Sequence, residues 1–80
     1  MDHNKVFDEV KEELNRQYAI KGHNQLPHSW WFIVMSEEIG EVAKELLMFD
    51  KERLRKEIIQ VAVAAIAWLE DDSAWSKKGR

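Results

Sequence analysis

The chain has 80 residues, 45% of them hydrophobic and 34% charged, with a net charge of −3 and no cysteine. A chain of this length makes one small domain, and small domains are often completed by a metal, by disulfides or by a partner chain. The absence of cysteine excludes disulfides and thiolate metal sites, and the mild negative charge argues against a basic nucleic-acid-binding surface or an acidic tail.

The start of the chain and its most apolar stretch favour a soluble protein of a reducing compartment, the cytoplasm. Residues 1–5 lack the basic start and the apolar run of a secretion signal. The most apolar stretch covers residues 58–69 and includes Gln60, whereas a helix needs about 20 apolar residues to span a bilayer. We therefore expect neither a membrane nor a nucleic acid as a partner.

The first predicted helix runs from about Asn4 to Ile20. Val6, Val10 and Leu14 recur at helical spacing with charged residues between them. Gly22 lies in a stop signal, and Pro27 disfavours helix at the residue before it.

The second predicted helix follows Ser29, a candidate N-cap, and continues to about Met48. At about 100° per residue, one continuous apolar stripe predicts its core-facing side. The stripe contains Trp31, Phe32, Met35, Ile39, Val42, Ala43 and Leu46. Glu38 and Glu45 border this stripe, while further apolar side chains project from the opposite side near the start of the helix.

The third predicted helix begins after Asp50, a candidate N-cap, and runs from Lys51 to Leu69. From Ile58 onward it is apolar all round, which is typical of a helix buried on every side. The last residues, 73–80, contain Ser, Gly and basic side chains and are predicted to form a frayed tail.

These elements predict an all-α protein with a single domain over residues 1–80. The second and third helices carry apolar side chains on more sides than a three-helix monomer can cover. We therefore expect a small helical hairpin or bundle that is completed by homo-oligomerisation, as a dimer or a tetramer.

Acidic side chains on the second and third helices predict a divalent-metal site. Glu38 and Glu41 are three residues apart and project from neighbouring points of one helix face. Glu57 comes sixteen residues after Glu41, enough for a turn and an antiparallel return. Carboxylates brought together repel unless a cation lies among them, and Mg²⁺ prefers oxygen ligands and often completes its shell with phosphate oxygens. A nucleoside triphosphate is therefore a natural ligand, and the chain has no glycine-rich P-loop to bind it otherwise.

The acidic residues carry a specific resemblance. Glu37-Glu38-Ile39-Gly40-Glu41 followed by Glu57-Ile58-Ile59-Gln60 resembles the paired EExxE and ExxD motifs of the MazG-like, all-α nucleoside triphosphate pyrophosphohydrolases. The similarity extends from about Pro27 to Glu70. It implies a helical bundle that assembles as dimers or dimers of dimers. It also implies Mg²⁺-dependent attack of water, with Mn²⁺ as a substitute, that splits a nucleoside or deoxynucleoside triphosphate into monophosphate and pyrophosphate in nucleotide-pool cleaning.

Carried onto this sequence, the resemblance makes Glu38, Glu41 and Glu57 metal ligands. Glu37 contributes a further ligand or orients the attacking water, so that Glu37 and Glu38 are the catalytic candidates. The aspartate of the second motif falls on Gln60, whose neutral carbonyl oxygen is a weaker metal ligand. A structural role for Gln60, with its amide hydrogen-bonded to another side chain, is about as well supported as contact with the metal.

Candidate substrate-binding residues flank the two motifs. Trp30 faces outward and is a candidate to stack on a nucleobase or to meet another subunit. His28 is a candidate for contact with the base, although a lone histidine is more often a surface or capping residue. Arg53 and Lys56 precede Glu57 and are candidates to hold the triphosphate, although Lys56 also forms an ordinary helical pair with Glu52.

Two alternative functions remain open at this point. Because Gln60 replaces a motif carboxylate, the chain is alternatively a non-catalytic or weakly active relative that binds nucleotide or metal. In the other alternative the glutamates form a solvated face, and the chain is a helical protein-interaction module whose apolar faces bind a partner.

Overall fold

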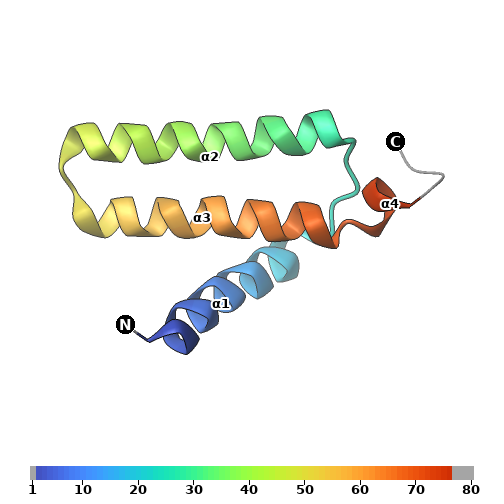
Figure 1. Ribbon diagram of the computed structural model, residues 1–80, viewed down its shortest axis with the longest axis horizontal. Helices are drawn as coiled ribbons and strands as arrows, with labels where there is room; N and C mark the ends of the chain where they lie inside the picture. Colours follow the sequence, from blue (N-terminus) through green and yellow to red (C-terminus); the bar gives the residue numbers. More distant parts are fainter. Residues whose placement is uncertain (1, 77–80) are drawn as a thin grey trace.

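The computed structural model describes residues 2–76, and within them it is helical, without strands. The helices are α1 (His3–Lys21), α2 (His28–Met48), α3 (Lys51–Glu70) and the short α4 (Asp72–Trp75). α2 and α3 form a long antiparallel hairpin, α1 runs obliquely to it, and α4 lies beyond the end of α3 (Figure 1). α3 is the central helix because it packs against α1, α2 and α4. The predicted all-α class is confirmed.

The ends of α1 follow from local chemistry. The Asp2 side chain caps the helix by accepting a hydrogen bond from the backbone N–H of Lys5 at 3.2 Å. At the other end Gly22 has a φ of 73° and its N–H donates to the carbonyl of Tyr18 at 2.9 Å. Glycine adopts this conformation without the steric cost that a Cβ would add, so the predicted stop at Gly22 is confirmed.

α2 begins at His28, two residues earlier than a helix capped by Ser29 would, and Ser29 is not its N-cap. The N-cap is Pro27, whose side chain makes no capping hydrogen bond. The carbonyl oxygen of Pro27 accepts from the N–H groups of Trp30 and Trp31 at 3.0 and 3.1 Å. Since Pro27 has an extended ψ and disfavours helix at Leu26, the helix starts directly after it, and Ser29 lies exposed in the first turn.

The turn between α2 and α3 is short, and it ends at Asp50. Asp50 caps α3 as predicted, and its Oδ1 accepts from the N–H of Arg53 at 3.1 Å. Phe49, just before it, adopts the left-handed conformation with a φ of 58° and is 91% exposed. This tight turn sets α3 antiparallel to α2, so residues on the inner faces of both helices lie opposite one another (Figure 1).

The core is small and is drawn from all four helices. Its buried apolar side chains are Leu14, Trp31, Val63, Ala64 and Ala74. The predicted stripe on α2 is confirmed at Trp31 but is wrong at Phe32, which is 63% exposed, and at Ile39 and Leu46, which are also exposed.

The inner face of α2 is rotated relative to the predicted stripe. Trp31 and Glu45 are buried and Glu38 is half-buried, and these residues recur every seven positions along the helix. Glu45 is only 7% exposed, and its Oε2 has no hydrogen-bond partner within residues 2–76. The side of α2 that faces α3 therefore includes Glu38 and Glu45, which were predicted only to border the apolar stripe.

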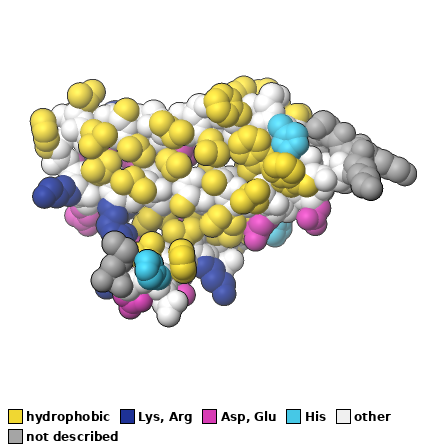
Figure 2. All heavy atoms as spheres, viewed as in Figure 1, with side chains coloured by type: hydrophobic (Ala, Val, Ile, Leu, Met, Phe, Trp, Pro, Cys, Tyr) yellow, Lys and Arg dark blue, Asp and Glu magenta, His cyan; other side chains and the backbone are white. Residues whose placement is uncertain are grey.

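The apolar surface of α3 is also covered only in part. Val63 and Ala64 are buried, but Ile58 and Leu69 are exposed, so the single chain does not cover α3 on every side, and its burial by a second copy stays a prediction. Hydrophobic side chains cover a broad area over α2 and α3 in Figure 2. The large exposed side chains of the hairpin include Trp30, Phe32, Ile39, Leu46, Leu47, Met48 and Phe49.

The predicted frayed tail at 73–80 is wrong in its first part. Ser73–Trp75 belong to α4, and Ala74 is buried. The physical reason is Asp71, whose side chain caps this short helix by accepting from the N–H of Ser73 at 3.1 Å. The end of the predicted tail, residues 77–80, lies outside the described residues. No helix within residues 2–76 is both long and apolar enough to cross a membrane.

Candidate functional site

Five predicted site residues, four glutamates and Gln60, line one pocket of about 590 Å³ between α1, α2 and α3. Glu37, Glu38 and Glu41 reach it from α2, and Glu57 reaches it from α3. They come together because the antiparallel hairpin places the middle of α2 beside the first half of α3. The carboxylates of the first motif and the glutamate of the second therefore share one cavity, although they come from two helices.

The surroundings of this pocket shift the pKa of Glu38. Burial raises the pKa of Glu38, and the neighbouring carboxylates of Glu57, Glu41 and Glu37 raise it further. Lys21 at the end of α1 acts in the opposite direction but does not outweigh them. A carboxylate whose pKa is raised by other carboxylates lies where positive charge is lacking, and a bound cation would supply that charge.

The donor set fits a hard divalent cation in its chemistry. All four side chains offer carboxylate oxygens, the ligands that Mg²⁺ prefers. As the side chains stand, no group of three or more His, Asp or Glu residues within the described range is arranged to hold a metal ion. Binding at this pocket would therefore require the carboxylates to turn toward a common point.

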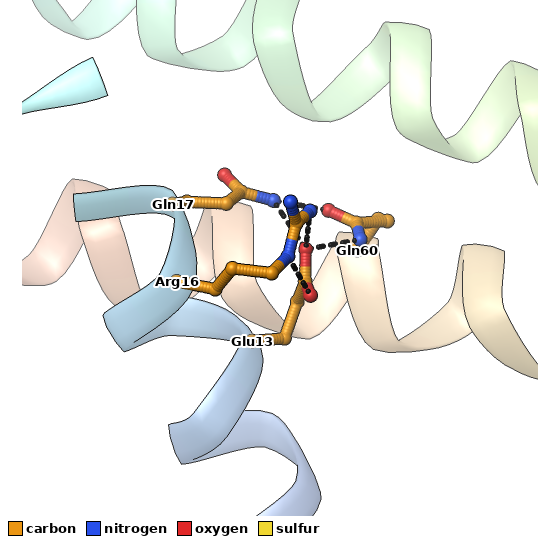
Figure 3. Close-up of polar contacts among 4 residues, drawn as sticks. All are labelled: Glu13, Arg16, Gln17 and Gln60. Carbon is orange, nitrogen blue, oxygen red and sulfur yellow. Dashed lines mark hydrogen bonds and ion pairs between the residues drawn. The ribbon is translucent and has the colours of Figure 1, made fainter. Parts of the chain in front are cut away.

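Gln60 lies at the edge of the same pocket, and its amide is engaged by α1 (Figure 3). Its Nε2 donates to Oε2 of Glu13 at 2.8 Å, and its Oε1 accepts from Nε2 of Gln17. Of the two roles considered for Gln60, the structural one is observed. The hydrogen bond from Arg16 outweighs burial, and together with those from Gln60 and Gln17 it lowers the pKa of Glu13 to about 2.

The predicted substrate-binding residues do not line the acidic pocket. Trp30 lies in the first turn of α2 with 57% of its surface exposed. Arg53 forms an ion pair with Asp50 at 3.7 Å near the α2–α3 turn. Lys56 lines a different cavity, between α1 and α3. The structure therefore separates these side chains from the carboxylates that they were predicted to assist.

His28 belongs to an aromatic cluster at the far end of the hairpin. Its Nδ1 accepts a hydrogen bond from Nε1 of Trp68 at 2.8 Å, and its ring meets that of Trp75 edge-on at 4.7 Å between centroids. Trp75 in turn donates from Nε1 to the carbonyl of Trp68 at 2.8 Å. These contacts bind α4 to the hairpin, so His28 has a structural role in the single chain.

α1 contributes pocket residues that the sequence analysis missed. Arg16 and Lys21 line the pocket together with Tyr18. Tyr18 donates to Oε1 of Glu70 at 2.7 Å, and burial together with this hydrogen bond raises the pKa of Tyr18 to about 12. No local signal marks these residues, because the oblique crossing of α1 over α3 is set by packing and not by the sequence of α1.

Asp71 is a second polar centre that the sequence analysis missed. It is 5% exposed, and its Oδ2 accepts from the N–H of Leu26 at 2.9 Å and from Nε1 of Trp31 at 2.8 Å. Burial opposes ionisation of Asp71, but the hydrogen bonds from Ser73, Trp31 and the backbone outweigh it and hold the pKa of this carboxyl well below its usual range. Asp71 therefore joins the loop before α2 to α2 and α4.

Comparison with protein-family models, with curated proteins and with solved structures found no match to this chain. The similarity to the MazG-like pyrophosphohydrolases therefore rests on the two motifs and on the residues that flank them. The pocket brings the glutamates of the two motifs together, as the sequence predicted.

Proposed function

We propose that the chain is a MazG-like, Mg²⁺-dependent pyrophosphohydrolase that converts a nucleoside or deoxynucleoside triphosphate into the monophosphate and pyrophosphate. The observation that carries the proposal is the shared pocket of Glu37, Glu38, Glu41 and Glu57. These are the motif positions of both helices except Gln60; Glu38 and Glu57 are half-buried, and Glu37 and Glu41 are exposed. A role in cleaning the cytoplasmic nucleotide pool belongs to the same proposal.

The charges that line the pocket support a nucleotide that arrives with a divalent cation. Four glutamates and two basic residues, Arg16 and Lys21, line it, and Arg16 is already paired with Glu13, so the ionised pocket has negative charge in excess. A divalent cation offsets this excess, whereas a triphosphate alone would be repelled. Glu38, Glu41 and Glu57 are the proposed ligands. Bound Mg²⁺ would offset phosphate charge and favour deprotonation of the attacking water.

The proposed reaction is a hydrolysis at the α-phosphorus. The oxygen of water forms a bond to this phosphorus, the bond to the oxygen that bridges to the β-phosphate breaks, and pyrophosphate leaves with the electron pair. Glu37, the pocket glutamate that is not among the proposed ligands, is the first candidate to orient the water and to accept its proton. Glu38 is the second candidate to take this proton.

Release of pyrophosphate tests the proposal. The purified chain should release pyrophosphate from at least one member of a panel of ribo- and deoxyribonucleoside triphosphates with Mg²⁺ or Mn²⁺. Glu38→Gln and Glu41→Gln should reduce the rate to background, whereas Glu12→Gln, an exposed glutamate of α1 outside the pocket, should keep it. Absence of release at high protein concentration with both metals would refute catalysis.

The exposed apolar side chains support the proposal that the working form is a homo-oligomer, a dimer or a tetramer. Leu47, Met48 and Phe49 at the tip of the hairpin are all largely exposed, and contiguous apolar surface of this kind marks interaction sites in soluble proteins. Light scattering at micromolar concentration should give a mass of two or four chains. A strictly monomeric protein would contradict this part of the proposal.

A weakly active nucleotide-binding relative is the second candidate, and the surroundings of Gln60 favour it. Gln60 supplies no negative charge, and its oxygen already accepts from Gln17. Thermal melting with Mg²⁺ and an α,β-methylene triphosphate separates the candidates, because any ligand that binds only the native state raises the melting temperature. A raised midpoint without pyrophosphate release would identify a binding protein, and an unchanged midpoint would favour an interaction module.

A further inference from the structure

A network of four polar side chains joins α1 to α3 beside the acidic pocket (Figure 3). Arg16 binds Glu13 in a bidentate manner, with Nε donating to Oε1 at 2.7 Å and Nη2 donating to Oε2 at 2.6 Å. Oε2 of Glu13 also accepts from Nε2 of Gln60 at 2.8 Å and from Nε2 of Gln17 at 3.2 Å. Glu13 is thus the centre of the network, and Arg16 and Gln60 are joined through it.

The network explains why an amide is suited to position 60. Gln60 donates to Glu13 with one end and accepts from Gln17 with the other. An aspartate at this position could not donate, and it would place a second carboxylate beside Glu13. Like charges at that separation repel. The motif aspartate is therefore incompatible with Glu13 in its observed place, and Gln60 belongs with Glu13.

The network also holds a guanidinium at the wall of the pocket. The Arg16 side chain is 59% exposed and lines the acidic pocket. Nε and Nη2 are used by Glu13, and Nη1 has no hydrogen-bond acceptor among residues 2–76. An arginine held by a bidentate carboxylate loses little side-chain freedom when it binds an anion, and its fork matches phosphate oxygens.

Lys21 provides a second positive charge on the same side of the pocket. It lies five residues after Arg16 on α1, lines the pocket, and acts on the charge of Glu38. The carboxylates lie on α2 and α3 and the basic residues on α1, so the pocket has an acidic part and a basic part. A phosphate chain between the two parts could meet a cation held by the carboxylates on one side and the side chains of α1 on the other.

We propose that Arg16 binds the phosphate groups of the substrate and that Gln60 is a positioning residue, which holds Arg16 in place through Glu13. The proposal rests on the proposed function, and it replaces Arg53 and Lys56 as the phosphate-binding candidates. It gives Gln60 a part in substrate binding that requires no contact with metal. The predicted consequence is that changes at Gln60 weaken the binding of phosphate and leave the chemical step unchanged.

Binding of inorganic tripolyphosphate in the presence of Mg²⁺ tests the proposal without requiring turnover. Titration calorimetry should show that Arg16→Gln raises the dissociation constant about tenfold or more, as expected for loss of a charge-assisted contact. Arg16→Lys should lie between this variant and the wild type because it keeps the charge but loses the fork. Lys11→Gln is the matched control, since Lys11 is an exposed basic residue of α1 outside the acidic pocket, and it should bind as the wild type does.

Gln60→Asp tests the positioning role. It should raise the dissociation constant for tripolyphosphate and, in an active protein, raise KM while kcat at saturation stays the same. A residue with only a structural role would lower the melting temperature of the variants and leave the dissociation constant unchanged.

The outcomes separate this inference from the proposed function. Pyrophosphate release with an unchanged KM in Arg16→Gln would overturn the inference and leave the proposed function standing. Binding of tripolyphosphate that depends on Arg16, without release of pyrophosphate from any triphosphate, would support the inference and refute catalysis. Failure of the wild-type chain to bind tripolyphosphate at millimolar concentration would overturn the inference.

Discussion

Two carboxylates withdrawn from solvent, Asp71 at the end of α3 and Glu38 midway along α2, differ in what surrounds them. Asp71 accepts hydrogen bonds from the indole of Trp31 and from the backbone of Leu26, and its pKa is lowered. Glu38 has the carboxylates of Glu57 and Glu41 as neighbours, and its pKa is raised, first by burial and then by these charges. The chain stabilises the first charge, whereas Lys21 compensates the second only in part.

This difference distinguishes a carboxylate that stabilises the fold from one that is a candidate for function. A carboxylate surrounded by donors contributes to stability, because its ionised form is favoured in the folded state. A carboxylate among other carboxylates costs stability, and a fold retains such a group where it binds something positive. Asp71 is accordingly a structural anchor, and the cluster around Glu38 is the candidate site. Substitutions at the two positions should then act on stability in opposite directions.

The largest expected effect is at Asp71. Asp71→Ala leaves the indole N–H of Trp31 and the N–H of Leu26 without their acceptor in a buried place, and it removes the cap of α4. Each unsatisfied buried donor costs roughly 1 to 3 kcal/mol, so the free energy of unfolding should fall by roughly 3 to 5 kcal/mol. Urea denaturation followed by tryptophan fluorescence measures this loss.

Asp72→Ala is the matched control for Asp71→Ala. Asp72 has the same side chain at the next position but is exposed, so its removal should change the free energy of unfolding by no more than about 0.5 kcal/mol. A loss at Asp72 equal to that at Asp71 would show that the end of α3 is held by something other than this carboxylate.

A smaller effect of opposite sign is expected at Glu38. Glu38→Gln removes a negative charge from the cluster and keeps the shape of the side chain. Because the folded state disfavours the ionised form of Glu38, the neutral variant should be more stable than the wild type at neutral pH in the presence of a chelator. The gain should be about 0.5 to 1 kcal/mol, the range of interactions between partly exposed charges. Thermal melting by circular dichroism measures it.

Salt and Mg²⁺ sharpen this test. High salt screens the repulsion, so the advantage of Glu38→Gln should shrink in 1 M NaCl. Millimolar Mg²⁺ should raise the melting temperature of the wild type by binding to its native state, and should raise that of Glu38→Gln less. A variant that is destabilised in chelator would mean that Glu38 is a structural carboxylate like Asp71, and the contrast between the two would be lost.

The hairpin and its acidic residues could be predicted from the sequence. Asp50 marks the start of α3, and the turn before it is too short to allow anything but an antiparallel return. The spacing of Glu38, Glu41 and Glu57 then predicts that these residues lie at the same level along the two antiparallel helices. These features depend on local capping and on helical periodicity, which are both present in the sequence.

The features that could not be predicted depend on how the elements pack. The wheel places Phe32 in the core because it assigns apolar residues to the inside, but α3 covers only one side of α2, and that side carries Glu38 and Glu45. Asp71 and Asp72 look equivalent in the sequence, and the donors that distinguish Asp71, among them the indole of Trp31 and the backbone of Leu26, become visible only in the structure. Similarly, the amide of Gln60 has no visible partner until α1 crosses α3 and brings Glu13 to it.

The dependence of stability on pH gives the smallest and most specific test of the contrast. Without metal, the folded protein takes up a proton at Glu38 at a higher pH than the unfolded chain does, because the folded pKa is raised. Stability should therefore rise as the pH falls through the folded pKa of Glu38, and the rise should be complete near 4.5, the ordinary pKa of a glutamate. It should be no larger than the gain from Glu38→Gln, and it should be absent from that variant. Below 4.5 the sign reverses, because Glu13 ionises in the folded state with a pKa of about 2, so its contribution is lost between pH 4.5 and 2. The lowered pKa of Asp71 adds to this acid loss below the usual range of an aspartate. Melting temperatures measured from pH 8 to pH 3 should thus pass through a maximum for the wild type. They should stay level above pH 4.5 for Glu38→Gln and fall less at acid pH for Glu13→Gln.

A wild-type melting temperature that falls steadily from neutral pH would mean that the carboxylates of the pocket do not repel one another, and the main reason for placing a cation among them would be gone.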